Sequence, residues 1–285
     1  MLRFLVPKKS SLSAPLRRFL SIAGYALGEG DVEDVESNGV RFTEAGRRSI
    51  PTLIARRAFD AGITGYDLYL NSGEELRSVA KLCFSRSSAQ ATRWVLACKQ
   101  GWAPGSGPVR IVTELPKLAK RLLDEAKVPF AYVIEEIDGT EELWVKEGLA
   151  ESVLLVTESG KSMFRNGLNV VSGVKSPLLV STPRIFAREG LGSEQEETLQ
   201  NLTFALKSVV DAHAMVMVTF DIDELFLPNL PLRSVIAPTY TCLDKNGWLS
   251  VQICIPREEY GFMGRRIKQA GGRSIVMQNI DGYSD

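Results

Sequence analysis

The sequence predicts an α/β protein that ends in a separate ferredoxin-like domain. Apolar runs of strand length alternate with segments of helical spacing through about the first two hundred residues, as in layered folds with mainly parallel strands. A long amphipathic segment, about Glu194 to Ala212, then acts as a connector. Beyond it the order of elements becomes β-α-β-β-α-β, which is the ferredoxin-like unit. We therefore place a domain boundary near His213, giving regions 1–213 and 214–285.

The elements of the first region are predicted from apolar spacing and from residues that start or end helices. Pro51 suits a first helical turn, and Gly62 is expected to close that helix. The acidic, glycine-flanked stretch Gly28–Asn38 is expected to be a loop. Strands are expected at Leu2–Val6, Val40–Thr43, Thr92–Cys98, Val109–Thr113, Phe130–Glu135, Val153–Val156 and Leu178–Ser181. Helices are expected at Leu12–Ala23, Thr52–Ala61, Lys117–Lys127, Glu141–Glu147 and Lys161–Arg165.

The second region contains four strand-like and two helix-like segments. Asp223 is expected to cap the first helix, because a short carboxylate can accept a hydrogen bond from the first turn. Strands are expected at Ala214–Phe220, Ser234–Thr241, Trp248–Ile255 and Ser274–Gln278. Helices are expected at Asp223–Leu227 and Glu258–Ala270.

Composition excludes several classes of function. Lys+Arg and Asp+Glu balance at 34 each, so no strong field exists to recruit nucleic acid or an anionic membrane. The four cysteines are scattered and the single histidine is His213, which leaves no pattern for a disulfide framework or a histidine-rich metal site. No apolar run approaches the roughly 20 residues that span a bilayer. The basic N-terminus reads better as a strand, Leu2–Val6, than as a targeting peptide, so we expect a cytoplasmic protein.

The segment from Val153 to Leu168 has the layout of a phosphate-binding turn. An apolar run of strand length is followed by Ser159-Gly160-Lys161-Ser162 and a short helical stretch that ends at Asn166-Gly167. Glycine lets the backbone approach an anion, and helix N–H groups and hydroxyls supply donors. It is not a Walker A loop, since the first glycine of that motif would fall at Leu155. An ordinary strand-to-helix turn capped by Ser159 is the alternative.

This segment resembles the signature of the ATP phosphoribosyltransferase family. There it reads roughly G-L-A-D-x-(apolar)-x-D-(apolar)-x-x-T-G-x-T-L-x-x-N-G-L, against Gly148-Leu149-Ala150-Glu151-Ser152 through Asn166-Gly167-Leu168 here. Further matches follow in the family's order along nearly the whole chain. They are Leu2–Leu12, Ile50-Pro51 before Ala61–Asp67, Arg110–Pro116, Gly139–Leu143 and three segments of the C-terminal part, Ser234–Pro238, Gly247–Val251 and Gly271–Ile275.

The resemblance implies a fold and a reaction. The core would have two lobes like a periplasmic binding protein, lobe I about 1–90 and 177–213 and lobe II about 91–176, with the site between them. The C-terminal domain would be regulatory and would bind an effector, histidine in the family. The family joins N1 of ATP to the ribose of phosphoribosyl pyrophosphate and releases pyrophosphate, which is the first step of histidine biosynthesis. Magnesium and a dimer or hexamer of this chain are implied as well.

The resemblance also implies site residues. The 5-phosphate of the sugar would bind Ser159, Gly160, Lys161 and Ser162. Glu158 would contact the same phosphoribosyl pyrophosphate, as a substitute for the family's acid at Leu155. Three catalytic residues are implied by matching positions: Lys8 near the pyrophosphate, Arg93 facing the cleft, and Glu142 on the ribose hydroxyls.

Two charged positions of the family pattern are lost, which leaves two hypotheses open. Leu155 stands at the family's aspartate, and Ser11 stands where the family often carries arginine. Charge-assisted contacts are each worth about 1.5–3 kcal/mol, so two losses bear directly on rate. The chain is either a divergent active enzyme, favoured by the intact glycine-hydroxyl turn, or a non-catalytic relative that binds ligand or regulates. A bilobed solute receptor is a weaker third interpretation, because it leaves the turn unexplained.

Overall fold

The chain folds into two compact units of α/β structure. A computed structural model describes residues 1–8, 10–28, 30, 32–84, 91–232, 238–243 and 247–284. The first unit comprises Met1–Arg18 with Tyr25–Thr203, and the second comprises Phe19–Gly24 with Phe204–Asp285. The division at Thr203 falls inside a long helix, α7 (Ser193–His213).

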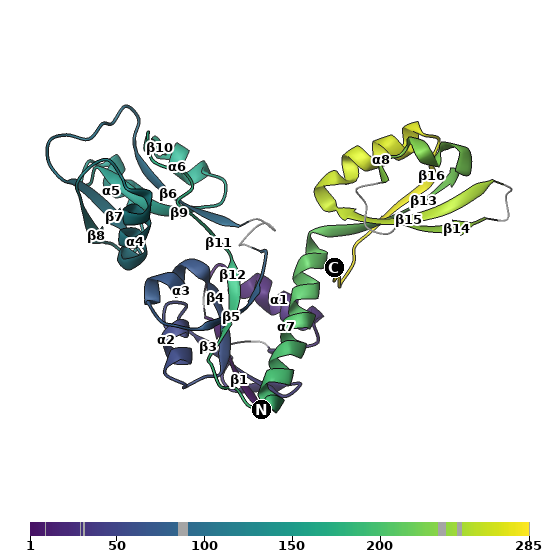
Figure 1. The fold of residues 1–285 in the computed structure, drawn as a ribbon, viewed down its shortest axis with the longest axis horizontal. Helices are drawn as coiled ribbons and strands as arrows, with labels where there is room; N and C mark the ends of the chain where they lie inside the picture. The colour runs from purple at the N-terminus through teal and green to yellow at the C-terminus, as the bar shows by residue number, and fades with distance from the viewer. Residues whose placement is uncertain are drawn as a thin grey trace. The chain divides into compact units, whose positions relative to one another are not determined.

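Lobe I of the first unit is built on a mixed sheet (Figure 1). The central strand β1 pairs in parallel with β3 and β4, and the outer pairs are antiparallel. In spatial order the described strands are β2 (Val35–Ser37), β3 (Val40–Ala45), β1 (Leu2–Pro7), β4 (Ala61–Gly65), β12 (Pro183–Ala187) and β5 (Arg77–Lys81). The helices of this lobe are α1 (Ser13–Ile22), α2 (Ile50–Ala55) and α3 (Tyr66–Ser72).

The region around Gly62 corrects the sequence prediction. The predicted helix Thr52–Ala61 ends early, since α2 stops at Ala55, and Gly62 lies in the buried strand β4. A Cβ on Gly62 would come within 2.9 Å of Leu5 on β1. Glycine is therefore needed here for close approach of two strands, and it does not mark a helix end. The expected loop Gly28–Asn38 also contributes β2.

Lobe II has a second mixed sheet. Its spatial order among the described residues is β10 (Leu168–Val170), β6 (Thr92–Lys99), β9 (Ser152–Thr157), β7 (Val109–Thr113) and β8 (Tyr132–Glu136), with β11 (Leu179–Ser181) also on β6. β7 runs parallel to β8 and β9, while β6 is antiparallel to β9. The prediction of mainly parallel strands is thus wrong, because in the described part of each lobe only the pairs made by one strand, β1 or β7, are parallel. In lobe II the difference comes from β6, which pairs antiparallel with β9, β10 and β11.

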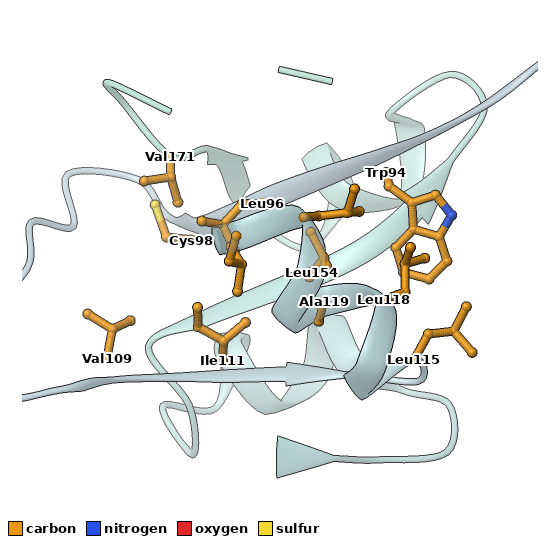
Figure 2. Close-up of a cluster of buried hydrophobic side chains, with 12 residues drawn as sticks. Trp94, Leu96, Cys98, Val109, Ile111, Leu115, Leu118, Ala119, Leu154 and Val171 are labelled. Carbon is orange, nitrogen blue, oxygen red and sulfur yellow. The ribbon is translucent and has the colours of Figure 1, made fainter. Parts of the chain in front are cut away.

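Helix α4 (Pro116–Ala126) covers one face of the lobe II sheet. Leu118 and Ala119 face side chains of the sheet in one buried apolar cluster, and Trp94 lies at the Leu115 and Leu118 end of it (Figure 2). A second cluster on this sheet includes Val145 of α5 (Glu141–Lys146) and Met163 of α6 (Lys161–Arg165). The sheet is therefore buried on both faces, as its continuous apolar strands predict.

The second unit has a ferredoxin-like order of strands. The described strands are antiparallel and ordered β14 (Thr239–Cys242), β15 (Trp248–Pro256), β13 (Met215–Asp223) and β16 (Arg273–Gln278). α8 (Tyr260–Gln269) buries Met263 and Ile267 against them. The first predicted helix is a 3-10 helix, η1 (Glu224–Asn229), and Asp223 caps it by accepting a hydrogen bond from the Leu225 amide at 3.0 Å. The predicted start of a strand at Ser234 lies outside the described residues.

No helix within the described part of the chain is long and apolar enough to cross a membrane.

Candidate functional site

A cavity of about 120 Å³ lies between the two lobes of the first unit. Lobe I contributes the end of β1, the turn between β4 and α3, and the chain between β11 and β12. Lobe II contributes the first residues of β6 and the ends of β7 and β9. Its lining is Pro7, Ser10, Ser11, Leu12, Arg47, Thr64, Gly65, Asp67, Leu68, Phe84, Thr92, Trp94, Glu114, Leu115, Val156, Glu158, Ser181, Thr182 and Pro183.

Asp67 fixes the inner wall of this cavity. It lies in the first turn of α3, directly after β4, and its Oδ1 accepts a hydrogen bond from the Leu68 amide at 2.9 Å. Its Oδ2 accepts one from Trp94 Nε1 at 2.9 Å, which joins lobe I to lobe II. The Asp67 amide donates to Ser181 Oγ at 3.2 Å. One carboxylate thus orients a buried tryptophan and ties it to the crossover between the lobes.

Thr182 is an unusual member of the lining. Only 3% of the residue is exposed, and its Oγ1 has no hydrogen-bond partner among the described residues. A buried hydroxyl without a partner costs about 1–3 kcal/mol. A group of this kind beside a cavity needs an explanation, and a ligand that bonds to it would supply one.

The glycine-hydroxyl turn follows β9 as predicted. Gly160 adopts the left-handed conformation with φ +74°, and a Cβ there would come within 3.1 Å of Phe164. The Gly160 amide donates to Thr157 Oγ1 at 2.8 Å, and Phe164 donates to the Gly160 carbonyl at 3.0 Å. Ser159, Lys161 and Ser162 are exposed around it. The turn is therefore a fixed backbone shape that presents short polar side chains to solvent.

Three carboxylates gather beside this turn. Ser162 Oγ donates to Glu142 Oε1 at 2.9 Å, so the first turn of α5 meets the first turn of α6. Burial, together with the negative charges of Glu114 and Glu142, raises the pKa of the neighbouring Glu141 to about 7. Glu114 also lines the cavity and accepts a hydrogen bond from Arg47 at 3.0 Å. These three carboxylates can accept hydrogen bonds from hydroxyl groups, and at neutral pH the cluster can retain a proton.

Leu155, at the family's aspartate position, belongs to the core of lobe II. It is 6% exposed and packs in the apolar cluster with Val95, Val145 and Met163. A leucine in this place fills space between α5, α6 and the sheet. Any hydroxyl of a ligand must find its acceptor elsewhere.

Some of the predicted site residues lie at the turn or line the cavity, and others do neither. Glu142 and Ser162 are in contact, and Glu158 leads from the cavity lining into the turn. Lys8 follows Pro7 at the end of β1 without itself lining the cavity. Arg93 lies between two lining residues of β6, but its own side chain is exposed. Because alternate residues of a strand point to opposite faces, Arg93 leaves β6 on the face away from Trp94.

Sequence reasoning missed several residues of the site. No role is predicted for Asp67, Glu114 or Trp94, although they lie within quoted motifs or a predicted strand. Nothing in the sequence singles out Arg47 or Thr182, because both matter only once the lobes are placed together. Among the described residues no cluster of three acidic, histidine or cysteine side chains is arranged to hold a metal ion.

The fold and the site define a two-lobed α/β protein with a glycine-hydroxyl turn beside an interlobe cavity. The family model for ATP phosphoribosyltransferase (HisG) matches residues 47–208. An ATP phosphoribosyltransferase from Salinispora tropica is 32% identical over 288 residues, covering 98% of each chain. One from Corynebacterium jeikeium is 27% identical over 287 residues, again covering 98% of each.

A solved structure has the same fold. A chain of the ATP phosphoribosyl transferase (HisG:HisZ) complex from Thermotoga maritima superposes with a TM-score of 0.63 at 20% identity. The match covers 75% of this chain and 100% of that one. The chain therefore belongs to the ATP phosphoribosyltransferase family, the enzymes of the first step of histidine biosynthesis.

Proposed function

We propose that this chain transfers the phosphoribosyl group of phosphoribosyl pyrophosphate to N1 of ATP and releases pyrophosphate. One observation carries the assignment of the site: the turn, the carboxylates and the cavity are continuous. Ser162 of the turn bonds to Glu142, and Glu158 at the start of the turn lines the cavity. A sugar diphosphate on the turn would thus lie beside a base held in the cavity.

The turn suits the 5-phosphate of the sugar. Ser159, Lys161 and Ser162 offer two hydroxyls and an ammonium group around a backbone that Gly160 holds in place. Glu142 then accepts hydrogen bonds from the ribose hydroxyls. As the bond from C1 to pyrophosphate breaks, positive charge develops on the sugar, and a nearby carboxylate stabilises it. N1 of ATP forms the new bond to C1, and pyrophosphate leaves with the electron pair of the old one.

The side chains that line the cavity suit the adenine of ATP once the lobes have separated enough to admit it. The cavity walls include the apolar side chains of Leu12, Phe84, Trp94 and Leu115 beside polar and charged residues. A flat, weakly charged ring gains most from such a slot. Thr182 Oγ1 is the buried hydroxyl available to hydrogen-bond a ring nitrogen.

Magnesium enters this site with its substrate. Mg²⁺ keeps several waters and binds through substrate phosphates plus one or two carboxylates, so a complete protein cage is not required. Glu114 and Glu142 fit the part of those carboxylates. Held there, the ion would supply positive charge to the leaving pyrophosphate. Lys8 is the protein cation we assign near that group, and Arg93 remains a prediction from its motif position.

The remaining assignments follow the family. We place the protein in the cytoplasm as a homo-oligomer, a dimer or hexamer, and assign the second unit to effector binding, with histidine as the candidate. A non-catalytic, ligand-binding role is the second candidate, and the core position of Leu155 favours it.

A single-turnover assay distinguishes the two candidates. Enzyme in excess is mixed with ATP, magnesium and phosphoribosyl pyrophosphate, and pyrophosphate is followed. The transferase releases about one equivalent per site, whereas the non-catalytic relative binds both ligands by calorimetry and releases none. Lys161→Ala should abolish binding of the sugar diphosphate, and Lys175→Ala, at an exposed lysine outside the cavity lining, is the matched control.

A further inference from the structure

Two consecutive arginines of lobe I reach across to lobe II. Arg48 donates to the Glu114 carbonyl at 3.2 Å and lies 3.5 Å from Glu136 Oε1 and 3.7 Å from Asp138 Oδ1. Arg47 pairs with the Glu114 carboxylate at 3.0 Å. These contacts join the turn before α2 to the ends of β7 and β8.

Arg47 and Arg48 lie on a turn whose backbone is held by hydrogen bonds. The Ser49 amide donates to the Gly46 carbonyl at 2.8 Å, which closes the turn between β3 and α2. Thr64 Oγ1 of β4 donates to the Arg47 carbonyl at 3.2 Å. The guanidinium groups therefore extend from a turn that is tied to the central sheet of lobe I.

The receiving side concentrates negative charge. Glu114 and Glu136 lie where the parallel strands β7 and β8 end, and Asp138 follows two residues later. Like charges placed together raise the energy of the lobe. A cation from the other lobe relieves that repulsion only when the lobes are close.

The cavity between the lobes is too small for its proposed ligands as it stands. It measures about 120 Å³, while pockets for small organic ligands are typically about 300–1,000 Å³. The lobes must separate before a nucleotide enters. Two further interlobe bonds must also break or move when the lobes part. One runs from the Leu118 amide to Asn71 Oδ1 at 3.0 Å, and the other is the Trp94–Asp67 bond.

We propose that Arg48 is an interlobe clasp that holds the empty cleft closed by pairing with Glu114, Glu136 and Asp138. Opening breaks these pairs and leaves the carboxylates facing each other. The clasp thus sets how often the empty cleft opens to admit substrate. The clasp concerns the protein without substrate. It can therefore be refuted while the proposed activity is confirmed, and the activity can be refuted while the clasp is confirmed.

Exchange of the Leu118 amide measures the clasp directly. That amide lies in the first turn of α4, and its described acceptor is Asn71 of the other lobe. In the full chain labelled with ¹⁵N-leucine, Arg48→Gln should speed Leu118 exchange about fivefold, the effect of losing about 1 kcal/mol of surface ion pairing. The Leu149 amide, which donates to Trp144 within lobe II at 2.8 Å, is the internal control. Arg56→Gln, at an exposed arginine that ends α2, is the matched variant.

Two further experiments test whether Arg48 holds the lobes together through its charge. Salt at about 0.5 M should speed Leu118 exchange in the native chain but hardly in Arg48→Gln, because exposed charges are screened. Glu136→Gln combined with Asp138→Asn should reproduce the Arg48→Gln effect and add little to it. The clasp is refuted if Leu118 exchange is unchanged in Arg48→Gln, if Leu149 accelerates equally, or if Arg56→Gln has the same effect.

Discussion

Lobe I and lobe II use buried carboxylates in opposite ways. In lobe I, Asp60 is fully buried and accepts hydrogen bonds from Arg3 at 2.9 to 3.2 Å and from Arg188 at 2.9 and 3.0 Å. In lobe II, Glu141 is partly buried beside Glu114 and Glu142. Burial alone would raise the pKa of both groups. The arginines more than offset it for Asp60, whose pKa is lowered, while the pKa of Glu141 is raised to about 7.

The difference separates a structural charge from charges available for chemistry. Asp60 joins the start of β1, the start of β4 and the end of β12, and its acceptor sites are occupied by protein donors. The carboxylates of lobe II lie by the glycine-hydroxyl turn and the cavity. Perturbed groups that cluster in a cleft are typical of functional sites. Changes at Asp60 should therefore affect folding, and changes at the lobe II group should affect activity.

Removal of the Asp60 charge should have the largest effect. Asp60→Asn leaves two guanidinium groups beside a neutral amide, which typically costs about 3–5 kcal/mol of unfolding free energy. Chemical denaturation at pH 7 measures the loss. The native chain should also lose stability in acid, because the lowered pKa contributes stability that is present above the ordinary carboxyl pKa and disappears as pH falls through the lowered value. Equal acid sensitivity in Asp60→Asn and the native chain would contradict this role.

The second prediction concerns Glu142, where we expect a loss of activity with little loss of stability. Glu142→Gln removes a charge-assisted contact with the ribose hydroxyls, worth about 1.5–3 kcal/mol, so kcat/KM should fall roughly 10- to 150-fold. Its unfolding free energy should change little, since the amide oxygen can still accept from Ser162. Steady-state kinetics and denaturation on the same preparation give both values. A fall in stability comparable to that of Asp60→Asn would place Glu142 with the structural charges.

The sequence predicted some of these features and not others, for physical reasons. β7 and α6 have the predicted bounds, and β1 and β9 differ from them by one residue at one or both ends, because apolar runs ending at polar residues mark buried strands. β4, with two glycines in five residues, has no such pattern. β12 begins at Pro183 and carries Arg184, so it does not resemble a buried strand either.

The site also contains features that the sequence predicts and features that it does not. The turn at Ser159–Ser162 and Glu142 are local or motif features, and the sequence contains them. The Asp67–Trp94 bond and the Arg48 contacts join residues of different lobes. No local pattern encodes such pairs, because they depend on how two separately folded sheets meet.

The third prediction tests the raised pKa of Glu141. The folded value of about 7 exceeds the unfolded value of 4.5, so the folded state holds an extra proton between these pH values. This stabilising contribution is complete below about pH 4.5 and disappears as pH rises through about 7. Glu141→Gln should remove about 1–2 kcal/mol of that pH dependence, after allowance for screening of a partly exposed group. Denaturation at several pH values measures it, with Glu147→Gln, exposed at the end of the same helix, as control.

The smallest predicted effect is at Thr182, and it distinguishes a ligand contact from a packing defect. Thr182→Val keeps the shape but removes the buried hydroxyl that has no described partner. The free protein should become more stable by up to about 1 kcal/mol, because an unsatisfied polar group is eliminated. If Oγ1 bonds to the adenine ring, the same variant should bind ATP about five- to tenfold more weakly while binding phosphoribosyl pyrophosphate normally. Calorimetry with each ligand separately gives both affinities. Unchanged ATP affinity together with higher stability would make Thr182 a packing defect at the crossover between the lobes, and the adenine would have to find its polar contacts elsewhere in the cavity.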